Sequence, residues 1–185
     1  MQVPYRIDND GVYHEGLHDS LDSLGWQSKA CFYFEHVFNW YHVPDEGDVV
    51  QIGCSFGCSL QVLTQQFGDR VFGIDPWNPL GHPAVIEKTI EEMDDMPVAF
   101  VHCNAGDFRS TPQLRLRALQ WSLRNLVHDG FCLTAGNHGP VEESLGFKVA
   151  DVAKDYGCVV EDIPDAIAAL TDQKFPVSDC IIIKE

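Results

Sequence analysis

Short apolar runs and longer amphipathic stretches take turns along this chain. The runs are typical of buried strands and lie at 49–52, 71–74, 98–103, 131–135 and 178–183, with a further strand beginning at Val159. The amphipathic stretches predict helices over 20–41, 60–67, 84–93, 112–126 and 142–156, and a short helical piece over 165–170. Because strands and helices alternate, we expect a three-layer α/β/α sandwich.

The same pattern predicts one domain, 1–185, with three parts. Residues 1–19 are polar and show no clear period, so we expect a loose arm or a lid there. The helix over 20–41 is expected to cover the sheet, because its apolar residues fall near one face. Residues 48–185 form the predicted α/β core.

The stretch 48–78 combines a strand, a glycine turn, a helix, a second strand and an acid. Gly53 lets the chain leave the first strand with dihedrals that other residues resist, and Gly57 lets a ligand approach the backbone closely. The N–H groups that open the helix near Ser59 suit a carboxylate or a phosphate. Asp75 ends the second strand, where an acid can accept hydrogen bonds from ribose hydroxyls. The stretch therefore predicts a nucleotide site.

The residues of this stretch narrow the choice of nucleotide. A dinucleotide fingerprint that starts at Gly53 needs further glycines where the chain has Ser55 and Cys58. The motifs I-G-C-S-F-G-C-S and G-I-D-P-W instead resemble those of the class I S-adenosylmethionine-dependent methyltransferases. The resemblance implies a Rossmann-like sheet, mostly parallel with an antiparallel C-terminal strand, and S-adenosylmethionine as the cofactor.

The resemblance also implies which residues hold the cofactor. It implies that the glycine turn and the start of its helix hold the methionine end, through Gly53, Cys54, Ser55, Gly57 and Ser59. It implies that Asp75 binds the ribose. Trp77 either stacks on the adenine or packs beneath its own loop, and Asn104 points into the cleft from the end of a later strand.

One strand of the implied sheet is missing between Asp75 and the turn at 129–130. In the family the third strand lies at an edge and the fourth lies beside the first, so loss of the third leaves fewer backbone groups unpaired. We therefore expect a sheet that lacks this edge strand, with 98–103 as the fourth strand. The spacing alone also fits 98–103 as the third strand.

His138 and Asp107 are the candidate catalytic residues. Methyl transfer to a hydroxyl or an amine requires alignment of the acceptor and removal of a proton. His138 follows a strand that ends at the cleft, and histidine is the side chain that titrates nearest neutral pH. Asp107 is a second candidate base, or an adenine partner if 98–103 is the third strand. His102 lies within a strand and is expected to be a satisfied core histidine.

Two departures from the family pattern bear on mechanism. Asn104 and Asn137 stand where some relatives hold a divalent cation with acids, and amides without a neighbouring carboxylate are weak ligands, so no metal is expected. Gln51 replaces a residue that is usually acidic, which weakens the expected contact to the cofactor's amino group. The sequence thus predicts a metal-independent methyltransferase acting on a small molecule. The alternative is a domain that keeps the fold for binding or regulation and has lost turnover.

A third hypothesis comes from residues 53–57, which also match the G-x-S-x-G nucleophile elbow of α/β-hydrolases. In a serine hydrolase, Ser55 would attack and His138 would be its base. An elbow needs an oxyanion donor from an earlier strand–helix loop, and the sequence indicates one helix and no suitable strand before Asp48.

Composition limits which classes of partner and which cellular compartment we expect. The chain has 185 residues and a formal net charge of -16, which disfavours nucleic-acid phosphates and anionic membranes. No apolar stretch has the length of a membrane span, and the N-terminus lacks a secretory apolar region. The cysteines resemble small buried hydrophobes in a reducing compartment. We expect a cytoplasmic protein with a small-molecule substrate and no nucleic-acid or membrane partner, and a homodimer stays open.

Overall fold

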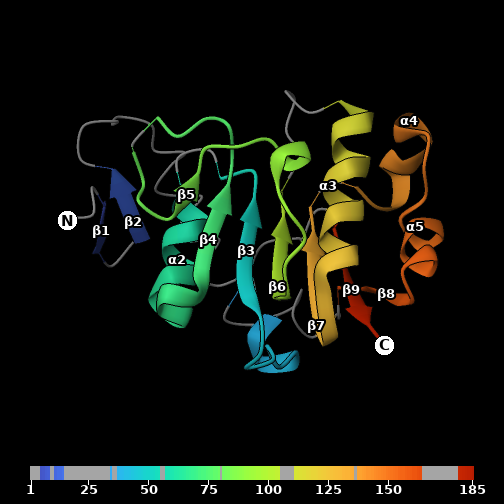
Figure 1. Cartoon of the computed structure of the whole chain (residues 1–185), viewed down its shortest axis with the longest axis horizontal. Coiled ribbons are helices and arrows are strands. Elements are labelled where there is room, and N and C mark those ends of the chain that lie inside the picture. Colours follow the sequence, from blue (N-terminus) through green and yellow to red (C-terminus); the bar gives the residue numbers. More distant parts are fainter. Residues whose placement is uncertain are drawn as a thin grey trace.

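A computed structural model describes residues 5–8, 11–14, 34, 37–54, 57–79, 81–104, 111–135, 137–163 and 179–185. Across these residues, seven strands form one sheet in the order β5-β4-β3-β6-β7-β9-β8 (Figure 1). The strands are β3 (Asp48–Ile52), β4 (Val71–Ile74), β5 (Val85–Ile86), β6 (Val98–Cys103), β7 (Leu126–Thr134), β8 (Cys158–Asp162) and β9 (Cys180–Lys184). The helices are α2 (Cys58–Phe67), α3 (Pro112–Asn125), α4 (Glu142–Leu145) and α5 (Val149–Asp155). Three 3₁₀ turns join them: η1 (Gly68–Arg70), η2 (Ile90–Glu92) and η3 (Gly139–Val141).

The pairing of the strands confirms the predicted sheet. From β5 through β4, β3 and β6 to β7, every pair is parallel. β9 is antiparallel to both β7 and β8, as predicted for the C-terminal strand. β6 lies between β3 and β7, so 98–103 is the fourth strand of the family sheet and the third-strand alternative is wrong.

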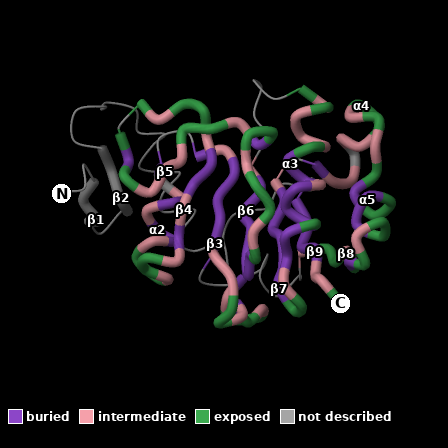
Figure 2. The backbone as a smooth tube through the Cα atoms, viewed as in Figure 1, coloured by how far each residue is buried: buried purple, intermediate pink, exposed green. Residues whose placement is uncertain are grey.

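Helices cover both faces of the sheet, which confirms the three-layer sandwich. Successive strand residues point to opposite faces, and the buried side chains accordingly form two clusters. Leu119 of α3 shares a cluster with Val50 on one face. On the other face, Leu60 of α2 and Phe34 share a cluster with Val49. Figure 2 shows that β3, β6 and β7, in the middle of the sheet, are buried along most of their length.

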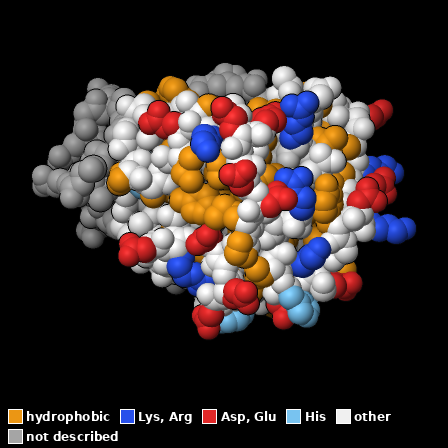
Figure 3. Space-filling model, in the orientation of Figure 1, with side chains coloured by type: hydrophobic (Ala, Val, Ile, Leu, Met, Phe, Trp, Pro, Cys, Tyr) orange, Lys and Arg blue, Asp and Glu red, His pale blue; other side chains and the backbone are white. Residues whose placement is uncertain are grey.

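The edge of the sheet beside β4 differs from the prediction. An edge strand is present, so its expected loss is wrong, although β5 has only two residues. The predicted helix over 84–93 is wrong as well, because the β-branched pair Val85–Ile86 joins β4 and Glu92 forms a capping box with Thr89 in η2. Phe72, Met93 and Met96 are only partly buried against the core. Figure 3 shows hydrophobic side chains gathered at the surface in the middle of the face that it displays.

One further expectation is corrected. The helix predicted over 142–156 is divided into α4 and α5, because Gly146 takes a left-handed conformation (φ 74°) and ends α4. Within 1–19, where a loose arm or a lid is predicted, β1 (Tyr5–Asp8) and β2 (Gly11–His14) pair antiparallel. Residue 34 and residues 37–40 are helical, as predicted for part of 20–41, and the helical piece over 165–170 lies outside the described residues.

The described cysteines pack as small hydrophobes, as predicted. Cys54, Cys103, Cys132, Cys158 and Cys180 are all buried and carry free thiols. None of the helices in the described part of the chain has both the length and the apolar composition needed to cross a membrane.

Candidate functional site

Four parallel strands end level with one another at one edge of the sheet. Ile52 of β3 pairs with Ile74 of β4 and with Cys103 of β6, and Cys103 pairs with Thr134 of β7. In open α/β sheets, ligands bind beyond the carboxyl ends of the strands. We call this edge the rim. The first residues after the four strands are Gly53, Asp75, Asn104 and Ala135.

The glycine turn and Asp75 meet at the rim through a direct hydrogen bond. The backbone N–H of Cys54 donates to Oδ2 of Asp75 over 2.7 Å, and the N–H of Trp77 donates to Oδ1 over 2.8 Å. Gly53 (φ 78°) and Gly57 (φ 79°) both take the left-handed conformation that favours glycine. Two backbone donors fix the orientation of the carboxylate, so the predicted ribose acid and the predicted cofactor turn share one location.

Gly73, in β4, lets the glycine turn pack directly on the neighbouring strand. A Cβ atom at this position would lie 2.3 Å from Sγ of Cys54 and 2.9 Å from Cδ2 of Leu60. The buried thiol of Cys54 donates to the carbonyl of Gln51 over 3.4 Å. Burial, together with the charge of Asp75, raises the pKa of the Cys54 thiol. The thiol therefore stays protonated and has a packing role.

The first turn of α2 offers backbone donors beside the glycine turn. The N–H of Gln61 donates to the carbonyl of Gly57 over 2.8 Å, so the N–H groups of Cys58, Ser59 and Leu60 come before the intrahelical bonds. Gly57 caps the helix without a side chain. The positive end of a helix dipole favours an anionic group, such as the carboxylate of an amino acid.

Two buried polar atoms lie just below the rim. Oε1 of Gln51 and Nδ1 of His102 have no hydrogen-bond partner in the described part of the chain. The His102 ring meets the Phe34 ring edge-on, with the ring centroids 5.0 Å apart. Burial lowers the pKa of His102 to about 4, so the ring is neutral at pH 7. The expectation of a satisfied core histidine is therefore wrong: the ring is buried, but its Nδ1 has no hydrogen-bond partner among the described residues.

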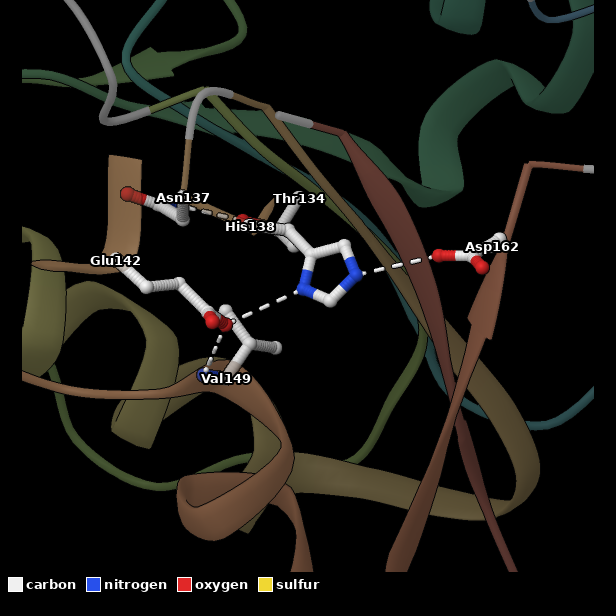
Figure 4. A network of polar contacts seen from close by, with 6 residues as sticks. All are labelled: Thr134, Asn137, His138, Glu142, Val149 and Asp162. Atoms are coloured by element: carbon white, nitrogen blue, oxygen red, sulfur yellow. Dashed lines mark hydrogen bonds and ion pairs between the residues drawn. The ribbon is translucent and has the colours of Figure 1, made fainter. Parts of the chain in front are cut away.

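His138 lies beyond the end of β7, between two carboxylates (Figure 4). Its Nδ1 is 3.2 Å from Oε1 of Glu142, and its Nε2 is 3.2 Å from Oδ1 of Asp162. The same Glu142 oxygen accepts a hydrogen bond from the N–H of Val149 over 2.9 Å. Carboxylates only accept, so each ring nitrogen can donate to its carboxylate only when it carries a proton. A role as base requires that Asp162, whose side chain is 89% exposed, leave Nε2.

The exits of β6 and β7 complete the described rim. Asn137 is fully buried and its Nδ2 donates to Oγ1 of Thr134 over 2.8 Å, while its Oδ1 has no partner among the described residues. Asn104 is held at the rim by a bond from its N–H to the carbonyl of Ile52. No cluster of three or more His, Cys, Asp or Glu suited to a metal ion occurs in the described ranges. Ser55 and Asp107 lie outside these ranges, so their predicted roles stay predictions.

The structure adds three residues that sequence reasoning left out of the site: His102, Glu142 and Asp162. It also places His102 beside Gln51, the residue that the sequence resemblance assigns to the cofactor's amino group. A sequence signal exists for His102, because it lies two residues before the rim on its own strand, as Gln51 does, and so points to the same face. For Glu142 and Asp162 the sequence holds no such signal, because they come from separate elements that only the fold brings to His138.

Comparison with known proteins gives matches among solved structures only. No protein-family model matches the sequence, and no curated protein matches it. The sugar N-methyltransferase KedS8 from Streptoalloteichus is 12% identical, with 97% of this chain and 98% of that chain covered and a TM-score of 0.63. The amino pentose methyltransferase CalS10 from Micromonospora echinaspora, solved with S-adenosylmethionine bound, is 12% identical, with coverages of 94% and 100% and a TM-score of 0.64.

A third similar structure comes from a different methyltransferase. The magnesium protoporphyrin IX methyltransferase from Synechocystis, also with bound S-adenosylmethionine, is 12% identical, with coverages of 92% and 87% and a TM-score of 0.58. The chain therefore has the class I S-adenosylmethionine-dependent methyltransferase fold, and the resemblance noted in its sequence is confirmed at the level of the fold.

Proposed function

We propose that this protein is an S-adenosylmethionine-dependent methyltransferase that acts on a small molecule without a metal. The proposal depends most on the 2.7 Å bond from the N–H of Cys54 to Asp75, which joins the glycine turn and the ribose acid at one point of the rim. It is supported by the bound cofactor in similar structures such as CalS10.

The residues present fit this cofactor. A zwitterionic amino-acid end requires acceptors and donors, and the site offers both: Oε1 of Gln51, an acceptor below the rim with no partner among the described residues, and backbone donors at the start of α2. The turn residues Gly53, Cys54, Ser55 and Gly57 would hold that end with their backbone, and the N–H of Ser59 would face its carboxylate. Asp75 would accept from the ribose hydroxyls, with Trp77 and Asn104 on either side. When bound, the cofactor supplies a methyl group on a sulfonium.

The acceptor side of the proposed site lies toward β7 and β8. Transfer to a hydroxyl or an amine requires removal of a proton, and His138 and Asp107 are the proposed bases. His138 would act through Nε2, once an acceptor takes the place of Asp162, while Glu142 holds Nδ1. The carboxylates beside His138 favour a neutral or cationic acceptor.

Calorimetry with S-adenosylhomocysteine tests the cofactor assignment. We expect binding that Asp75→Asn weakens by roughly tenfold or more, because hydrogen bonds to a charged group contribute about 1.5–3 kcal/mol. Asp69→Asn is the matched control: Asp69 is exposed on η1, before β4, and its replacement should leave the affinity unchanged. Absence of binding to the wild-type chain at millimolar cofactor would contradict the proposal.

Two further measurements separate the alternatives. Labelling of Ser55 by a fluorophosphonate would favour the serine hydrolase. Binding of the cofactor without methyl transfer to any member of a panel of small hydroxyl and amine compounds would favour a domain that has kept the fold and lost turnover.

A further inference from the structure

Gln51 and His102 form a pair on one face of the sheet. They are register partners on the parallel strands β3 and β6, so their side chains stand side by side on adjacent strands, roughly 4.8 Å apart at the backbone. Both are buried, with relative exposures of 1% and 6%. In the part of the chain that the structure describes, Oε1 of Gln51 and Nδ1 of His102 both lack a hydrogen-bond partner. A buried polar atom without a partner costs about 1–3 kcal/mol, so two of them together require an explanation.

Both atoms of this pair can act as acceptors. Nε2 of Gln51 donates to the carbonyl of Gly53 over 3.3 Å, which fixes the amide with Oε1 as its unpaired end. His102 is neutral at pH 7, because burial lowers its pKa to about 4, and a neutral ring with its proton on Nε2 accepts at Nδ1. The pair therefore suits a group that carries several N–H or O–H donors.

We propose that His102 Nδ1 and Gln51 Oε1 accept hydrogen bonds from the α-ammonium group of bound S-adenosylmethionine. This inference rests on the proposed function. The resemblance already implies a contact from the position of Gln51 to the cofactor's amino group, and the new element is His102, a residue outside the glycine turn. The ammonium group has three donors and no acceptor, which matches two convergent acceptors.

The strand order decides between the ammonium and the other groups of the cofactor. β3 lies between β4 and β6, so Asp75 on β4 and His102 on β6 fall on opposite sides of the glycine turn. With the ribose at Asp75, the amino-acid end would reach toward β3 and β6. The carboxylate of that end accepts hydrogen bonds and would face two further acceptors at the pair, whereas the donors at the start of α2 suit it.

A pair of ligands isolates this contact. S-adenosylhomocysteine carries the ammonium group, and 5′-methylthioadenosine shares its adenosine part but lacks the amino-acid end. In calorimetry, His102→Leu should lower the affinity for S-adenosylhomocysteine by about tenfold or more. It should change the affinity for 5′-methylthioadenosine by less than about twofold. Gln51→Met should give the same selective loss, and His102→Asn, which keeps an acceptor near Nδ1, should retain most of the affinity.

Asp75→Asn is the comparison variant. Both ligands carry the ribose that Asp75 is proposed to bind, so this variant should lower the affinity for both by a similar factor. Circular dichroism shows whether each variant is folded, and His102→Asn and Gln51→Met keep the test decisive if His102→Leu does not fold. Equal losses for both ligands, or no loss for S-adenosylhomocysteine, would overturn the inference. An unchanged affinity for S-adenosylhomocysteine is the result expected if a buried water, and not the ammonium group, bonds to these two atoms. A wild-type chain that binds neither ligand would instead contradict the proposed function itself.

Discussion

At the β3–β4 half of the rim, backbone groups make the contacts that fix the site, whereas at the β7–β8 half the contacts run between side chains. The carboxylate of Asp75 is held by two backbone N–H groups, and Cys54 is buried against β4. His138 is held by Glu142 and by the exposed Asp162. Backbone contacts change little without refolding, while an exposed carboxylate can be displaced by a ligand. The first half thus suits a constant cofactor, and the second suits an exchangeable acceptor.

The packing of the first half should be the most sensitive to substitution. Gly73→Ala places a Cβ 2.3 Å from Sγ of Cys54, so the turn must shift. We expect the free energy of unfolding to fall by about 3 kcal/mol, at the upper end of the range for overpacking, as measured by urea denaturation. Cys54→Ala removes the clashing sulfur, so the double variant should be more stable than the sum of the single losses predicts. Simple additivity would show that the clash is not the cause.

The buried ring below the first half should make stability depend on pH. Burial lowers the pKa of His102 from its ordinary 6.5 to about 4, so between these values the unfolded chain binds a proton that the folded chain does not. Stability should therefore fall as pH drops from about 6.5 toward 4, by about 2 kcal/mol between pH 7 and pH 5 for this group alone. Urea denaturation at the two pH values measures the difference.

His102→Asn is the control for this pH dependence, because it removes the titrating group and should flatten the slope by that amount. Burial also lowers the pKa of His82, whose contribution has the same sign and persists in the variant. A slope that is the same in both proteins would mean that His102 is accessible to protons in the folded chain.

The side-chain contacts of the second half should contribute least to stability. Glu142→Gln weakens the contact to His138 and the bond from the N–H of Val149, and should lower the free energy of unfolding by about 1 kcal/mol. Asp162→Asn should cost about 0.5 kcal/mol or less, because that pair is screened by solvent. Urea denaturation at pH 7 ranks the two. A larger loss for Asp162 would show that the β7–β8 half is as fixed as the first.

Local patterns were sufficient to predict much of the core. The strands at 49–52, 71–74 and 98–103, and the glycine turn with its acid, follow from short-range periodicity and from the special conformations that Gly53 and Gly57 adopt. The edge at Val85–Ile86 was mispredicted, because β-branched residues within a helical period gain more from backbone bonds to β4 than from a helix of their own. Gly146 is a similar case, since its left-handed conformation outweighs the period of the helix.

The sequence by itself determined which residues could form a cofactor turn and where the strands that carry them end. Only the tertiary structure decided that His102 stands beside Gln51 with an Nδ1 that has no partner among the described residues, and that Glu142 and Asp162 converge on His138. The reason is physical: a turn depends on dihedral angles within a few residues, whereas the burial and partners of a polar side chain depend on strand register and on elements distant along the chain.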